Sequence, residues 1–218
     1  SDTMMSQTYD SINMSVIDDN APLDEPTGKD WKPVWQAQYP DWDGIEYWWD
    51  YDVPETVAGL ELARLSTPLH RFAWQWKDGS STTYEADFVR GLVGTAGQEK
   101  ERPFRRIVVH KPWLLDSNRM SDIGPTSNIS WQAAYVRYRV LYWWDYDPDF
   151  SLALERALVA GQTFHFHRAW GDGEATDYVA DPVKGVVRNV QSGSLRRLRR
   201  LFFAQPVVDG SLIADVNR

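Results

Sequence analysis

The alternation of large apolar side chains with small or polar ones predicts a β-hairpin in each half of the chain. In the first half, Phe72, Trp74 and Trp76 alternate with their neighbours, and the Asp-Gly pair at 78–79 supplies a turn. The second half repeats this pattern around the Asp-Gly pair at 172–173. Further strands are predicted where aromatic and β-branched residues gather again, at 91–94, 106–110, 131–145, 186–190 and 198–203.

Helical spacing of apolar residues occurs once in each half. Phe150, Leu154 and Leu158 fall on one face of an amphipathic helix, and Gly161 follows as a helix C-terminal glycine. The helix predicted near 55–65 is weaker, because a glycine interrupts it. We therefore expect a mainly β fold, with β-sandwich or barrel-like domains that each carry one short α-helix.

The two halves of the chain repeat one another in sequence. The letters YWWDYD at 47–52 recur at 142–147, and the letters WQA at 35–37 recur at 131–133. Other matching segments follow in the same order, 72–79 with 166–173, 82–93 with 176–187 and 102–106 with 196–200. Because this agreement exceeds what chance gives, we predict two tandem copies of one domain.

The repeat and the composition together predict four parts of the chain. Residues 1–30 are polar and acidic and are expected to form a flexible arm, and 31–110 form the first β domain. Residues 111–130 contain Pro, Gly, Ser and Asn, which is typical of a linker. Residues 131–218 are expected to form the second β domain, the internal repeat of the first.

Charge and composition exclude several classes of function. The net charge is −8, and the excess of acidic residues is concentrated in 1–55, which contain 13 acidic and two basic residues. This acidic balance argues against binding of the phosphate backbone as the main activity. The absence of cysteine removes disulfides, thiol catalysis and cysteine-ligated zinc. No membrane span or signal peptide is visible, so we expect a protein made in the cytoplasm without a membrane partner.

Repeated acidic residues and a pair of histidines offer catalytic and metal-binding alternatives. Asp50 and Asp52 recur as Asp145 and Asp147, and paired carboxylates are typical of glycosidases. Acids that precede a helix also cap it, and we favour that interpretation. The His-Phe-His run at 165–167 has spacing suited to a metal on one strand face, but the first copy lacks it. No motif for a nucleophile or a nucleotide is present, so we predict no enzyme, no metal and no cofactor.

Repeated tryptophan pairs and arginines are the strongest candidates for a binding surface. Neighbouring residues on a strand face opposite sides, so one indole of each pair can enter the core while the other points outward. Outward tryptophans stack on sugars or anchor subunit contacts, and arginines pair with carboxylates of a partner or with nucleic acid. The candidate subunit-interface residues are Trp48, Trp49, Trp143, Trp144, Arg105, Arg106, Arg196, Arg197, Arg199 and Arg200.

The organisation of the chain resembles the tail tube (major tail) proteins of long-tailed bacteriophages, in the duplicated-domain form. The resemblance rests on a polar N-terminal arm, a strand, a short helix, and W-x-D-G hairpins at 76–79 and 170–173 followed by strands that open at 89–91 and 183–185. In that family the domain is a β-sandwich flanked by a helix, and six domains form a ring. Members that carry the domain twice form trimeric rings with pseudo-sixfold symmetry.

The resemblance implies a structural virion protein of the phage tail. It implies homo-oligomeric rings that stack into a tube, contacts with other phage tail proteins, and passage of DNA through the lumen without specific binding. The alternative is a carbohydrate-binding protein with two Trp-bearing β modules, which predicts quenching of tryptophan fluorescence by oligosaccharides. A hydrolase that uses the repeated aspartates predicts loss of activity in Asp50→Asn or Asp145→Asn.

Overall fold

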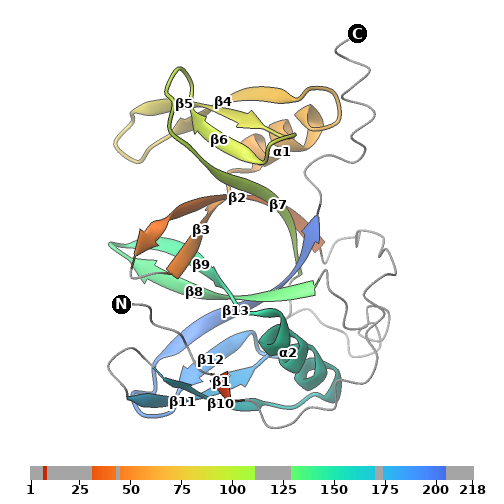
Figure 1. Cartoon of the computed structure of the whole chain (residues 1–218), viewed down its shortest axis with the longest axis vertical. Coiled ribbons are helices and arrows are strands. Elements are labelled where there is room, and N and C mark those ends of the chain that lie inside the picture. The colour runs from red at the N-terminus through yellow and green to blue at the C-terminus, as the bar shows by residue number, and fades with distance from the viewer. Residues whose placement is uncertain (1–6, 9–30, 43–44, 111–128, 170–173, 205–218) are drawn as a thin grey trace. The chain divides into compact units, whose positions relative to one another are not determined.

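The computed structural model describes residues 7–8, 31–42, 45–110, 129–169 and 174–204. Within them the protein is mainly β and has two α-helices, as the sequence predicts (Figure 1). None of the helices in this part of the chain has the length and apolar character needed to cross a bilayer.

The chain forms two compact units, which we name by the half of the sequence that supplies most of each. Among the described residues, the first-half unit comprises 33–40, 48–108 and 204, and the second-half unit comprises 7–8, 31–32, 41–42, 45–47, 109–110, 129–169 and 174–203. Residues 31–32 and 41–42, at the two ends of the first long strand, therefore belong to the second-half unit. So do residues 45–47, at the beginning of the next strand.

In the first half, strands β2 and β3 precede a helix and a four-stranded antiparallel meander. The elements are β2 (Trp31–Trp42), β3 (Ile45–Tyr51), α1 (Pro54–Ala63), β4 (Leu69–Gln75), β5 (Ser81–Asp87), β6 (Leu92–Thr95) and β7 (Glu101–His110). Their order in the sheet is β3-β2-β7-β6-β5-β4, and α1 lies beside β4 (Figure 1). Strand β4 ends this order, so its outer edge is open among the described strands.

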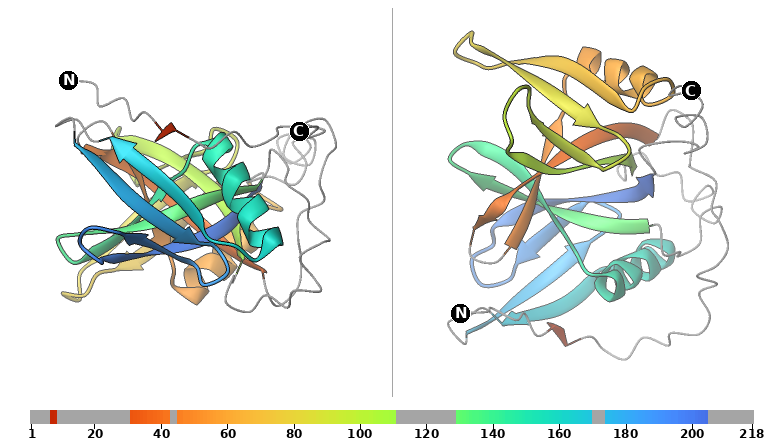
Figure 2. Two further views of the ribbon diagram at one scale, coloured as in Figure 1. Left: turned by 90° about the horizontal axis from the view of Figure 1, so that it is seen from below. Right: turned by 45° about the horizontal axis from the view of Figure 1, so that its top comes forward.

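The second half has the same succession of elements. They are β8 (Ile129–Arg137), β9 (Val140–Asp145), α2 (Pro148–Ala160), β10 (Phe164–Ala169), β11 (Ala175–Asp181), β12 (Val186–Asn189) and β13 (Leu195–Ala204). Their order is β10-β11-β12-β13-β8-β9, and α2 packs against β8, β10 and β11 (Figure 2). The edge of β10 is covered by β1 (Gln7–Thr8), a short strand within the segment predicted to be an arm.

Local signals in the sequence explain where these elements begin and end. Asp147 caps α2, because its Oδ1 accepts a hydrogen bond of 2.8 Å from the backbone N–H of Phe150. Gly161 ends α2 in the left-handed conformation, and Gly79 at φ +85° makes the turn between β4 and β5. These predictions are confirmed, while the corresponding turn at 172–173 lies outside the described residues.

One strand prediction is wrong. The segment 131–145 was expected to be a single strand, but it forms most of the β8–β9 hairpin. Tyr138 and Arg139 turn the chain with φ values of 51° and 64°. Two successive residues with positive φ are typical of a type I′ turn, which usually carries Asn or Gly. Since neither residue occurs at this turn, the sequence contains no signal that the strand is interrupted.

Each unit has its own hydrophobic core around a fully buried tryptophan. In the first half, Trp35 packs against Phe88 and Phe104, with ring centroids 5.3 and 5.0 Å away. In the second half, Trp131 shares a core with Phe150, which stacks on Tyr146 at 4.2 Å. The two tryptophans belong to the WQA segments that match in sequence, so these matching letters fall at core positions.

Candidate functional site: paired arginine networks and an aromatic pocket

A buried ion pair joins helix α2 to strand β13 in the second half. Arg200 on β13 donates from Nε to Glu155 Oε1 over 2.6 Å and from Nη2 to Oε2 over 2.7 Å. The indole N–H of Trp131 donates to the same Oε1 over 2.8 Å. Both charged side chains are almost completely buried, at 3% and 2% exposed, and the three hydrogen bonds stabilise the Glu155 charge away from water.

The first half contains the corresponding cluster. Arg106 donates to Glu61 over 2.6 and 2.9 Å, and the indole of Trp35 donates to Glu61 Oε1 over 2.9 Å. Glu61 is more exposed than Glu155, with 23% of its side chain accessible. Burial raises the pKa of Glu61, but the hydrogen bond and positive charge of Arg106 outweigh this effect, so the pKa is lowered from its ordinary value of 4.5.

The lowered pKa of Glu61 predicts a contribution to acid stability. An unfolded Glu61 takes up its proton at higher pH than the folded one, so the ion pair stabilises the fold above pH 4.5 and this stabilisation is lost as the pH falls further. We expect the stability difference between wild type and Glu61→Gln, measured by urea unfolding from pH 6 to pH 3, to shrink below pH 4.5. A difference that stays constant over this range would contradict the assignment.

A second polar network in the second half links an arginine, a glutamine and an aspartate. Gln132 on β8 donates to Asp145 Oδ1 over 2.6 Å, and its Oε1 accepts from Arg199 Nε over 2.8 Å. The Arg199 guanidinium also lies over the ring of Trp143, with 3.7 Å from Cζ to the ring centroid. Arg199 on β13 therefore contacts Gln132 on β8 and Trp143 on β9, and Gln132 extends the network to Asp145.

The same network recurs in the first half. Gln36 on β2 donates to Asp50 Oδ1 over 2.8 Å, and its Oε1 accepts from Arg105 Nε over 2.9 Å. The Arg105 guanidinium lies over Trp48 at 3.6 Å. The repeated residue types thus make the same contacts at corresponding positions in both halves.

The candidate interface residues differ in how much of each side chain is exposed to solvent. Arg106, Arg199 and Arg200 are buried, and Arg105 is partly buried, each with hydrogen bonds inside the chain. Arg196 and Arg197 are exposed. Trp48 and Trp143 are buried, and Trp49 and Trp144 are partly buried and pack against the two cores. Assignment of any of these residues to a subunit interface stays a prediction.

Three of the four repeated aspartates and one of the two histidines make structural contacts with other described residues. Asp147 caps α2, while Asp50 and Asp145 accept hydrogen bonds from glutamine side chains. His165 and His167 are exposed, and His167 pairs with Asp177 on the neighbouring strand. No group of three His, Asp or Glu side chains in the described part of the chain has the arrangement of a metal site.

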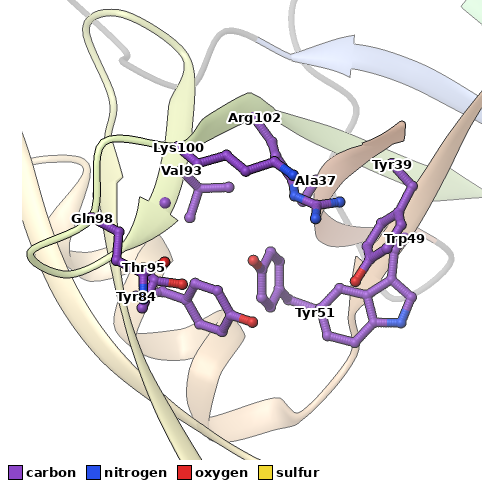
Figure 3. A pocket seen from close by; sticks show the side chains of 11 residues that line it. Ala37, Tyr39, Trp49, Tyr51, Tyr84, Val93, Thr95, Gln98, Lys100 and Arg102 are labelled. Carbon is purple, nitrogen blue, oxygen red and sulfur yellow. The ribbon is translucent and has the colours of Figure 1, made fainter. Parts of the chain in front are cut away.

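A pocket of about 160 Å³ lies within the first-half unit (Figure 3). Sequence reasoning missed this pocket, because its walls come from β2, β3, β5, β6, β7 and the turn before β7. The side chains that share it are mostly aromatic or basic. The lining residues are Ala37, Tyr39, Trp49, Tyr51, Tyr84, Val93, Gly94, Thr95, Gln98, Lys100 and Arg102.

The corresponding region of the second half is arranged differently around Trp144. The guanidinium of Arg168 on β10 lies over the Trp144 ring, with Cζ 3.6 Å from the centroid. Burial lowers the pKa of Arg168 to about 10. The position that matches Arg168 in the first half is Trp74, which meets Trp49 edge to face at 5.0 Å. An aromatic side chain therefore replaces a buried cation at this point of the repeat.

Comparison with known protein families, with curated proteins and with solved structures finds no match for this chain. The assignment of a function therefore depends on the geometry of the described residues.

Proposed function

We propose that this chain is a structural subunit of a phage tail tube, built from two tandem copies of one β domain. The support for duplication is the matching set of contacts in the two halves. Each half has a Trp-Glu-Arg cluster and a Gln-Asp-Arg network at corresponding positions, with hydrogen bonds of similar length. In this proposal each copy is a β-sandwich or barrel-like domain with one helix.

The open edge of β4 is the observation that carries the proposal of assembly. An unpaired strand edge is a template for another strand, and soluble proteins usually protect such edges. The corresponding edge of the second half, on β10, is covered by β1, where Thr8 lies opposite His167 and Gln7 opposite Arg168. The repeat aligns His167 with Ala73, so one of two equivalent edges has a partner strand and the other is open among the described strands.

Backbone geometry shows which groups of β4 are available for pairing. Hydrogen bonds join Trp76 N–H to Ser80 O and Phe88 N–H to Pro68 O, which fixes the alternation of bonded pairs along the β4–β5 ladder. Ala73 lies opposite Thr83 at a position without ladder bonds, so its N–H and C=O face the outer edge. Its side chain is exposed.

We infer that an extended segment of a neighbouring copy adds to β4 at Ala73, as β1 does to β10. Such a contact joins different surfaces of two copies, so it closes into a ring when the rotation between subunits permits. Three duplicated chains then give a ring of six domains. The rings stack into a tube in the virion, contact other tail proteins and let DNA pass without specific binding, in agreement with the acidic charge of the chain.

The sugar-binding alternative has less support from the geometry. A carbohydrate module needs indole faces open to solvent, whereas Trp48 and Trp143 are buried and Trp49 and Trp144 pack against the cores.

The proposal is tested with Ala73→Pro. Proline removes the outward N–H of Ala73 without removing a bond of the β4–β5 ladder, and it is tolerated on edge strands. We expect the wild-type chain to form rings or tubes in negative-stain electron microscopy and light scattering, and Ala73→Pro to remain monomeric at the same concentrations.

Ala73→Ser is the matched control, because it changes the same exposed side chain and keeps the N–H group. It should assemble like the wild type. A wild-type chain that stays monomeric across the concentration series would overturn the proposed function, and equal assembly of Ala73→Pro would overturn the role of the β4 edge.

A further inference from the structure

The pocket of the first-half unit contains basic and hydroxyl groups and no acidic side chain among its lining residues. Lys100 and Arg102 bring positive charge to it, and Tyr39, Tyr51 and Tyr84 bring phenol groups (Figure 3). A cavity with this composition favours a ligand that carries negative charge and accepts hydrogen bonds.

Arg102 supplies a donor that the described protein does not satisfy. Its Nη1 atom is buried and has no hydrogen-bond partner among the described residues. The same guanidinium lies over the ring of Tyr39, with Cζ 4.2 Å from the ring centroid, which holds the side chain in place. Buried donors nearly always have a partner in folded proteins, and a bound water or ligand supplies one where the protein does not.

Two tyrosine hydroxyls converge on the same space. Figure 3 shows the hydroxyl groups of Tyr51 and Tyr84 pointing into the pocket. Burial raises the pKa of both phenols, and the neighbouring tyrosines add to the effect. Both groups are therefore protonated at neutral pH and can donate hydrogen bonds to an oxygen atom of a ligand.

The size and walls of the pocket favour a small flat ligand. Its volume of about 160 Å³ is similar to that of a cavity of ~150 Å³, which holds one benzene molecule. The walls include the rings of Trp49, Tyr51 and Tyr84, which offer faces and edges for contact with a planar group.

We propose that this pocket binds a carboxylate carried on a compact planar group, with Arg102 and the hydroxyls of Tyr51 and Tyr84 as hydrogen-bond donors. Lys100 adds a second positive charge at the rim. The site is separate from the β4 edge, so ligand binding and ring assembly can be measured independently.

The second half is not expected to bind the same ligand. Its own Arg168 guanidinium is buried against Trp144, and serines at 192 and 194 replace Gln98 and Lys100. We therefore expect one binding site in each chain.

The proposal is tested by titrating the full-length chain with benzoate, followed by isothermal calorimetry and tryptophan fluorescence. We expect one benzoate per chain and at least about tenfold weaker binding of benzamide, which has the same shape without the charge. Arg102→Gln should also weaken benzoate binding by at least about tenfold, and Tyr84→Phe should weaken it a few-fold.

Arg196→Gln is the matched control, since Arg196 is the residue of the second copy that corresponds to Arg102. It should leave benzoate affinity unchanged, and circular dichroism should verify that each variant is folded. Equal binding of benzoate and benzamide, or no effect of both Arg102→Gln and Tyr84→Phe in folded protein, would overturn the proposal.

Discussion

Replacing Glu155 with glutamine is expected to lower the free energy of unfolding by about 3 to 5 kcal/mol. The substitution leaves the Arg200 guanidinium almost completely buried without its carboxylate, and it weakens the acceptor for the indole N–H of Trp131. A buried charge without its partner keeps its full desolvation cost and loses the attraction that offset it. Urea unfolding followed by far-ultraviolet circular dichroism measures the change.

Glu61→Gln is the matched control for this prediction. Glu61 makes the corresponding contacts with Arg106 and Trp35, but 23% of its side chain is exposed to water, so solvent screens the unpaired charge in the variant. Its effect should be clearly smaller than that of Glu155→Gln. Equal effects of the two substitutions would show that burial does not determine the energy of these ion pairs.

Local signals in the sequence predicted the local elements and little beyond them. The Asp-Gly pair at 78–79 and the cap and glycine at the ends of α2 act over a few residues, so they are readable without the fold. The β8–β9 turn was missed, because Tyr138 and Arg139 adopt positive φ without the residues that usually signal it. The hairpin is set by the pairing of its two strands and not by its turn sequence.

The sequence repeat marks some residues of the polar networks but does not show which side chains they contact. The letters WQA recur at 35–37 and 131–133, which singles out these positions. The side chains that contact the Trp and Gln of each segment, however, lie far along the chain. Glu155 and Arg200 reach Trp131 from α2 and β13, and only the fold brings the three together. The arginines predicted to serve an interface include members that the chain uses internally, because the same guanidinium chemistry suits both roles.

The pocket was also not predictable from the sequence. Its lining residues recur in part in the second half of the sequence, and the halves differ at Gln98 and Lys100, where the second half has serines at 192 and 194. The unsatisfied Arg102 donor beside two phenols depends on the packing of several strands, so the sequence alone does not show it.

Phe150→Ala is expected to destabilise the second-half core by about 3 to 5 kcal/mol, measured by the same urea unfolding. The Phe150 ring is fully buried, stacks on Tyr146 at 4.2 Å and meets Phe166 edge to face at 4.6 Å. Its loss removes the ring contacts of Phe150 with Phe164 and Phe166 on β10 and leaves a cavity that the surrounding rings cannot fill without changing their geometry.

Val159→Ala on the same helix is the control for this prediction, because Val159 is 60% exposed. It should change the free energy of unfolding by less than about 0.5 kcal/mol. A loss below about 1 kcal/mol for Phe150→Ala would mean that the aromatic cluster repacks around the smaller side chain. The larger loss would show that α2 is held to its strands by this ring as well as by the Glu155 ion pair.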